Sequence, residues 1–151
     1  MIIAVGSDHA GLELKDQLGK YLADKGYQVQ DLGTYTSESV DYPDYGEKVG
    51  SVVAAGEAEL GICVCGTGIG ISIAANKVCG IRAAVVHDVT SARLAKAHNN
   101  ANVVCFGERM ITFEVSRQAI DAFLESSFEG GRHIKRIEKL NNLDKLREGN
   151  E

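Results

Sequence analysis

The chain has 151 residues, 44% hydrophobic and 25% charged, a balance typical of a globular protein rather than a disordered or fibrous one. A net charge of −5 argues against a general nucleic-acid-binding surface, which is usually basic. No stretch reaches the roughly 18 apolar residues of a membrane span, and no leader pattern opens the chain, so the sequence predicts a cytoplasmic protein. The length suits a single domain over 1–151, with about 141–151 as a partly flexible C-terminal extension.

Short apolar runs alternate with helical patterns along the whole chain. Strands are predicted over 1–5, 27–32, 60–64, 82–86 and 101–106. Helices are predicted over 11–25, 45–56, 71–77, 91–97, 115–124 and 131–146. A polar loop over 33–44 follows the second strand. Buried strands that alternate with helices predict a three-layer, doubly wound, Rossmann-like α/β fold with a five-stranded parallel sheet. The apolar face of the last helix would pack on the domain or on a second subunit.

The stretch 60–76 combines a strand, a glycine-rich turn and the start of a helix. Free N–H groups and the positive end of the helix dipole make such a turn an anion site. Cys65 stands at its edge, where the dipole favours the thiolate form, and the Thr67 hydroxyl could bond the thiolate or a bound oxyanion. We therefore interpret the turn as an oxyanion cradle beside a thiolate base. The N–H groups of the cradle belong to Gly66, Thr67, Gly68, Ile69 and Gly70.

Two nucleotide-binding motifs resemble this turn but do not match it. A dinucleotide fingerprint needs Gly or Ala at position 71, where this chain has Ile71, and no phosphate-binding loop with a Gly-Lys-Ser/Thr ending occurs. Cys63 is expected to be an ordinary buried thiol, and the cysteine spacing does not fit a zinc site. These patterns support neither a zinc site nor a nucleotide cofactor.

Polar side chains also follow other predicted strands. Asp8 and His9 follow the first strand, and Arg109 follows the fifth. In doubly wound sheets, ligands bind outside the carboxyl ends of the strands, so these side chains should gather around the glycine turn. His98 lies just past a predicted helix, where it is as consistent with a histidine bonding helix carbonyls as with a catalytic one.

Arg132 and Arg136 share one face of the last helix because they are four residues apart. Cations at the start of a helix oppose its dipole, so their placement suggests another reason. With Arg109 they would make a clamp for a phosphate dianion. A plain solvated face is the alternative.

Several motifs together resemble one protein family, which contains the type B ribose-5-phosphate isomerases and the subunits of galactose-6-phosphate isomerase. The resemblance runs from Met1 to about Leu140. Its motifs are GSDHAG at 6–11, DYPD at 41–44, CGTGIG with SIAANK at 65–77, HNNAN at 98–102 and EGGRH at 129–133.

The resemblance implies interconversion of ribose 5-phosphate and ribulose 5-phosphate through a cis-enediolate, a reaction of the non-oxidative pentose phosphate pathway, without a cofactor. By analogy His98 assists ring opening, Cys65 moves the proton between C2 and C1, and Thr67 and the amides of 66–70 hold the enediolate. Part of the family uses a glutamate base at the position of Ile71, so this chain resembles the cysteine-based branch.

The family analogy also assigns the remaining contacts. Sugar hydroxyls would be held by Asp8, His9 and Asn99, and the phosphate by Arg109, Arg132 and Arg136. The resemblance implies a homodimer or a dimer of dimers whose sites are shared between subunits. Two alternatives stay open: an isomerase of allose 6-phosphate or galactose 6-phosphate, and a non-catalytic sugar-phosphate sensor.

Overall fold

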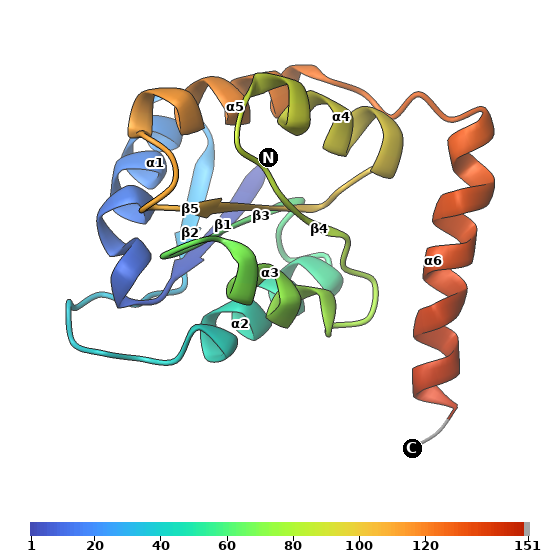
Figure 1. Ribbon diagram of the computed structural model, residues 1–151, viewed down its shortest axis with the longest axis horizontal. Helices are drawn as coiled ribbons and strands as arrows, with labels where there is room; N and C mark the ends of the chain where they lie inside the picture. Colours follow the sequence, from blue (N-terminus) through green and yellow to red (C-terminus); the bar gives the residue numbers. More distant parts are fainter. Residues whose placement is uncertain (150–151) are drawn as a thin grey trace.

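The computed structural model describes residues 1–149, which form a parallel sheet of five strands in the order β2-β1-β3-β5-β4 (Figure 1). The strands are β1 (Ile2–Ser7), β2 (Gln28–Asp31), β3 (Leu60–Cys65), β4 (Ala83–Val85) and β5 (Val103–Gly107). The helices are α1 (Leu12–Asp24), α2 (Tyr42–Ala54), α3 (Ile69–Asn76), α4 (Val89–Asn99), α5 (Phe113–Glu125) and α6 (Arg132–Glu148), with a short 3-10 turn, η1 (His9–Gly11). The predicted doubly wound α/β class is confirmed.

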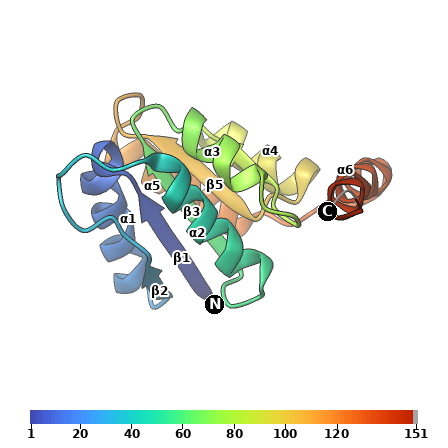
Figure 2. The same cartoon turned by 90° about the horizontal axis from the view of Figure 1, so that it is seen from below.

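Helices cover both faces of the sheet. Helices α1, α4 and α5 lie on one face and α2 and α3 on the other, while α6 runs beside the β4 edge (Figures 1 and 2). The central strand β3 is buried at every residue, as expected of a parallel strand with helices on both sides. Its carboxyl end, Cys65, is paired with Gly107 at the carboxyl end of β5.

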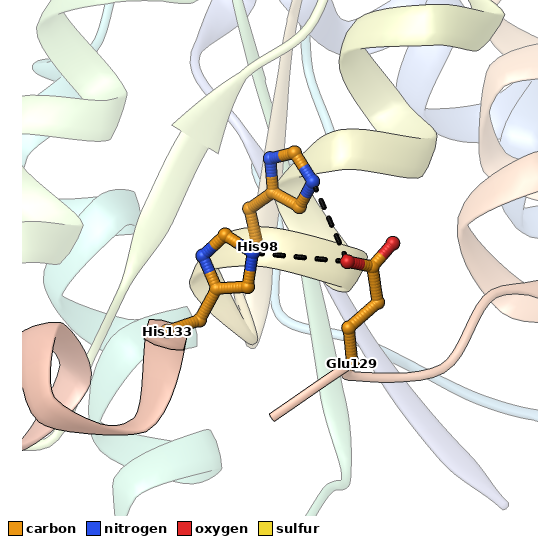
Figure 3. Close-up of side chains that lie close together, drawn as sticks. All are labelled: His98, Glu129 and His133. Atoms are coloured by element: carbon orange, nitrogen blue, oxygen red, sulfur yellow. Dashed lines mark ion pairs between the residues drawn. The ribbon is translucent and has the colours of Figure 1, made fainter. Parts of the chain in front are cut away.

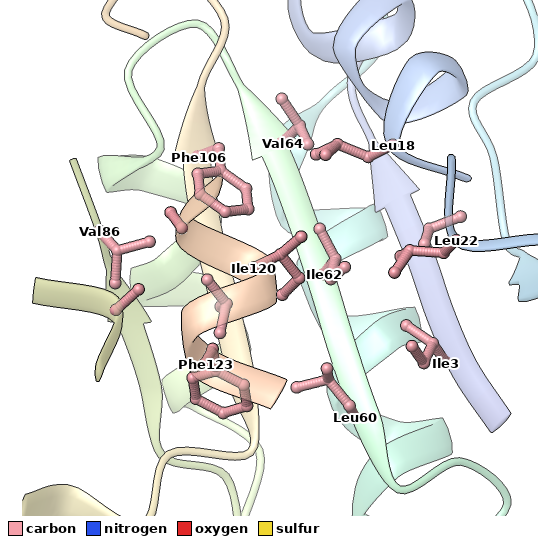
Figure 4. Close-up of a cluster of buried hydrophobic side chains, with 14 of the residues drawn as sticks. Ile3, Leu18, Leu22, Leu60, Ile62, Val64, Val86, Phe106, Ile120 and Phe123 are labelled. Carbon is pink, nitrogen blue, oxygen red and sulfur yellow. The ribbon is translucent and has the colours of Figure 1, made fainter. Parts of the chain in front are cut away.

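The larger core fills the space between the sheet and the helices α1, α4 and α5. Figure 4 shows Ile62 and Val64 of β3 packed between Leu18 of α1 and Ile120 of α5. Each of these side chains is fully buried. Burying one such side chain stabilises the fold by about 1.5–3 kcal/mol, so this core holds the strand ends in fixed positions.

Helix starts explain where the predicted boundaries differ from the structure. Helix α2 begins at Tyr42, three residues before the predicted start, because Pro43 fits the first helical turn, where its missing N–H costs nothing. Helix α4 begins after Asp88, whose side chain and Ser91 form a capping box. It continues to Asn99, so His98 lies inside the last turn rather than beyond the helix.

The C-terminal segment is helical and attached to the domain through polar contacts. Asp144 Oδ2 accepts a hydrogen bond from the Gly80 N–H at 2.8 Å, and the Arg147 guanidinium donates to the Lys77 carbonyl at 3.2 Å. The predicted extension 141–151 is therefore α6 as far as Glu148, and residues 150–151 lie outside the described part. Within 1–149 no helix is both long and apolar enough to cross a membrane.

Candidate active site

A polar pocket of about 230 Å³ lies at the carboxyl edge of the sheet. Its position follows from the topology, because β1, β3 and β5 are neighbours and all end there. The pocket contains seven predicted site residues from three strand ends. Its lining is Asp8, His9, Ala10, Tyr42, Cys65, Gly66, Thr67, Gly70 and Arg109.

Cys65 lies at the end of β3 with only 4% of its surface exposed. Its Sγ accepts a hydrogen bond from the N–H of Gly68 at 3.2 Å. An N–H group aimed at the sulfur can stabilise negative charge that develops there during a reaction. The sulfur therefore faces the pocket in a setting suited to proton transfer.

The two cysteines behind Cys65 have a different environment. Cys63 and Cys105 are opposite each other on β3 and β5, and both are fully buried. The hydrogen bond that the Cys105 thiol donates to Cys63, together with burial, raises the pKa of Cys105 well above its ordinary value. This pair is part of the core, as predicted for Cys63.

The glycine turn depends on close backbone packing against the end of β5. Gly68 has φ of +78°, and a Cβ there would lie 2.9 Å from the Phe106 carbonyl carbon. At Gly107 a Cβ would lie 2.4 Å from the backbone of Thr67. Backbone N–H groups of Glu108 and Arg109 bond the carbonyls of Cys65 and Gly66 at 2.9 and 3.0 Å. The turn is thus fixed by its neighbour strand.

Not all five predicted cradle amides are free. The Gly68 amide bonds Cys65 Sγ, and the Ile69 amide bonds Thr67 Oγ1 at 3.2 Å. The amides of Gly70 and Ile71 lie in the first turn of α3, where no intrahelical acceptor exists. Of the five predicted amides, those of Gly66, Thr67 and Gly70 belong to residues that line the pocket, where they could meet an oxyanion.

Asp8 and His9 are held in place before any substrate arrives. One carboxylate oxygen of Asp8, Oδ1, accepts hydrogen bonds from the N–H groups of Ala10 and Gly11 at 3.0 and 3.2 Å. The Nδ1 of His9 accepts from the Val40 N–H at 3.1 Å. In the neutral ring this places the proton on Nε2, so His9 presents a donor.

The loop that supplies Val40 is anchored by a buried cation. The Lys15 ammonium has a fully buried side chain and lies 2.8 Å from both carboxylate oxygens of Asp31. Asp31 also accepts the Gly33 N–H at 2.9 Å through Oδ1 and the Tyr35 hydroxyl at 2.9 Å through its carbonyl. The ion pair thus fixes the start of the loop that reaches His9.

Replacing Lys15 with methionine should lower the free energy of unfolding by about 1–3 kcal/mol, because it leaves Asp31 without its charged partner. Urea unfolding measures the change. Lys20→Met is the matched control, since its pair with Asp24 is exposed, and it should barely move the midpoint. Equal effects of the two substitutions would contradict the assigned role of Lys15.

Tyr42 is a pocket residue that the sequence interpretation did not assign to the site. Its ring covers Gly70, where an added Cβ would lie 2.7 Å from the ring carbon Cζ. The sequence does contain the two matching residues: a bulky tyrosine at the start of α2 and a glycine in the first turn of α3. Such a pairing becomes visible only when α2 and α3 are known to pack together.

Gly68 and Ile69 belong to the glycine turn beside the pocket, whereas the other four predicted site residues lie away from it. Helix α4 ends near the start of β5, where the carbonyl of Asn99 accepts a hydrogen bond from Arg82 Nε at 3.2 Å. The five residues of β5 separate this end from the pocket by roughly 16 Å. Within one chain His98 and Asn99 therefore do not reach Cys65.

Arg132 and Arg136 are exposed in the first turns of α6, on the same side of the molecule as His98. In residues 1–149 neither guanidinium has a hydrogen bond or an ion pair. Arg109 is the one predicted phosphate ligand in the pocket. The structure thus separates the predicted clamp into two parts.

His98 belongs to a cluster with two residues whose chemistry had not been predicted. Its Nε2 and the Nε2 of His133 each lie 3.7 Å from Oε2 of Glu129 (Figure 3). The two imidazoles stack, with ring centres 4.3 Å apart. Loss of hydration lowers the pKa of His133, and the cations Arg132 and Arg136 add to that effect.

A thiol, a carboxylate, an imidazole and a guanidinium around an amide-lined turn define a site for a small anionic, hydroxylated substrate. Comparison with known proteins identifies the class. The family described as Ribose/Galactose Isomerase matches residues 3–140, and the chain belongs to this family.

Named relatives extend over nearly the whole chain. Ribose-5-phosphate isomerase B of Escherichia coli (strain K12) is 46% identical over 145 residues, which cover 96% of this chain and 97% of that protein. The Clostridium thermocellum ribose-5-phosphate isomerase B structure has a TM-score of 0.96 and 47% identity, covering 97% of this chain and 99% of that one. The Mycoplasma genitalium ribose-5-phosphate isomerase B with bound ribulose-5-phosphate has a TM-score of 0.92 and 42% identity, covering 95% and 96%.

Proposed function

We propose that the protein is an aldose-ketose isomerase that interconverts D-ribose 5-phosphate and D-ribulose 5-phosphate. The observation that carries the proposal is the hydrogen bond from the Gly68 amide to Cys65 Sγ at the edge of a polar pocket. An isomerisation through an enediolate needs a base beside an acidic carbon and donors where negative charge develops. The family membership and the relatives' activities support the same reaction.

Cys65 is the base in this proposal. Its thiolate removes the proton from C2 of the open aldose, and the electron pair moves so that the C1 oxygen becomes part of a cis-enediolate. The amide of Gly70 and the Thr67 hydroxyl stabilise that charge. The resulting thiol returns a proton to C1 while the proton of the C2 hydroxyl passes to O1, which gives the ketose and restores the thiolate.

Asp8, with one oxygen already bonded to the backbone, and the Nε2 donor of His9 hold sugar hydroxyls. Arg109 meets one side of the phosphate. Holding the phosphate away from the reacting carbons fixes the open sugar in position, so that binding energy can be used for orientation.

The site is completed by a second copy of the chain. His98, Asn99, Arg132 and Arg136 of one chain lie too far from its own pocket, but a twofold axis would place this end against the pocket of the partner. His98 of the partner subunit would open the furanose ring, and the partner's arginines would close the phosphate clamp. The surface of α6 fits such a contact, since it exposes the apolar residues Ile134, Leu140, Leu143 and Leu146.

A second candidate substrate is a 6-carbon sugar phosphate, because the family description joins ribose and galactose isomerases. The pocket would then have to accept one more hydroxylated carbon between C2 and the phosphate. A sugar-phosphate sensor is the non-catalytic alternative.

The test is a turnover measurement on chelator-treated protein with ribose 5-phosphate, followed by NMR. We expect ribulose 5-phosphate to form to equilibrium. Binding of the sugar phosphate without any product would favour the sensor and contradict the proposal.

A further inference from the structure

The cluster formed by His98, Glu129 and His133 presents three potential metal ligands to one point. The three ligand atoms lie within 4.8 Å of one another. They come from the end of α4, the segment between α5 and α6, and the first turn of α6 (Figure 3). No other group of three such residues was found within 1–149.

His133 is the most buried member of the cluster. The residue is only 6% exposed, and its ring has no hydrogen bond among the described residues. Its Nε2 faces Glu129 Oε2 at 3.7 Å, which is too far for a direct hydrogen bond. An atom bridging the three groups would give the His133 nitrogen a partner that no described residue provides.

Two imidazoles and a carboxylate are a donor set that binds Zn²⁺ with one position left for water. Ligands about 2.0–2.1 Å from a tetrahedral zinc ion lie about 3.4 Å apart, closer than the 3.7 Å from each histidine to Glu129 and the 4.8 Å that bounds all three atoms. The stacked rings must also tilt so that their lone pairs converge. His98 and Glu129 can move, since their side chains are 34% and 55% exposed.

We propose that His98, Glu129 and His133 bind one first-row transition-metal dication per chain, with Zn²⁺ as its representative, and that the ion inhibits the isomerase reversibly. The inhibition rests on the proposed function, because the ion would occupy the Nε2 of the histidine assigned to ring opening. The ion would also tie α6 to α4. Apart from the ligand His133, the buried residue of α6 is Ile137.

Binding is tested first without reference to activity. The Cys65→Ala protein removes the pocket thiolate, which could itself capture zinc. Titration of this variant with Zn²⁺ against a fluorescent zinc indicator should give one ion per chain. A second substitution in the Cys65→Ala protein, either Glu129→Gln or His133→Ala, should weaken Zn²⁺ binding at least about tenfold, because each removes a ligand. His87→Ala, a histidine outside the cluster, should leave the affinity unchanged.

Cobalt(II) reports on the ligand type. Bound to the Cys65→Ala protein, it should give the weak visible bands of nitrogen and oxygen ligation, without a thiolate charge-transfer band. Absence of stoichiometric zinc binding would overturn the proposal, and so would affinity that Glu129→Gln and His133→Ala both leave unchanged. Because Glu129 is exposed, Glu129→Gln keeps the test decisive if His133→Ala fails to fold.

The inhibitory role is tested by turnover of ribose 5-phosphate with and without Zn²⁺. Zinc should inhibit the unsubstituted protein, chelator should restore activity, and Glu129→Gln should shift the inhibition to at least about tenfold higher Zn²⁺. Equal sensitivity of the two proteins would place the inhibitory ion elsewhere and overturn that role. If no turnover occurs at all, the proposed function fails, while the binding titration still decides the metal site.

Discussion

Cys65→Ala is expected to lower kcat by about 10²–10⁴-fold, because it removes the general base and leaves no substitute within the pocket lining at the same strand end. The affinity for sugar phosphate should stay close to that of the unsubstituted protein, since the hydroxyl and phosphate contacts remain. Steady-state kinetics together with calorimetric binding of ribose 5-phosphate separates the two effects.

Cys63→Ala is the matched control for this substitution. Cys63 lies two residues earlier on β3, is fully buried and faces Cys105 rather than the pocket. The Cys63→Ala protein should have a somewhat lower free energy of unfolding and an unchanged kcat. An activity loss as large as that of Cys65→Ala would show that the wrong cysteine was assigned, and unchanged turnover in Cys65→Ala would remove the thiolate mechanism.

Mixed dimers should recover activity that neither parent shows. Cys65→Ala disables one half of the proposed shared site and His98→Ala the other half, so each pure variant has only defective sites. After co-refolding in equal amounts, a mixed dimer combines both substitutions in one site and leaves its second site intact. Random pairing then restores about a quarter of the unsubstituted activity.

Pairing Cys65→Ala with Arg109→Ala is the control, because both residues line the same pocket and no mixed dimer has an intact site. This mixture should stay inactive. If the first mixture also stays inactive although the chains exchange, His98 does not act across a subunit boundary.

The sequence predicted the elements that have strong local signals. The periodic apolar residues of α1 and α5 and the Thr112 cap of α5 are where they were expected. The predicted start of α2 was wrong because proline is compatible with two local structures. Pro43 was assigned to a loop, although proline is equally suited to the first turn of a helix. The order β2-β1-β3-β5-β4 depends on contacts between distant segments and was not predicted.

The candidate site divides in the same way. Asp8, Cys65 and Arg109 could be brought together in advance because parallel strands share a carboxyl edge. The position of His98 depends on the direction of α4, whose last turn lies far from the carboxyl edge of the sheet. No local pattern shows that direction. The Val40 contact to His9 and the Glu129–His133 cluster likewise depend on tertiary packing.

The central claim is most directly tested by kcat/KM of the chelator-treated protein on ribose 5-phosphate, allose 6-phosphate and galactose 6-phosphate side by side. The account predicts the highest value for ribose 5-phosphate and its loss in Cys65→Ala. A higher value for either 6-carbon substrate, or turnover of ribose 5-phosphate that survives Cys65→Ala, would contradict it.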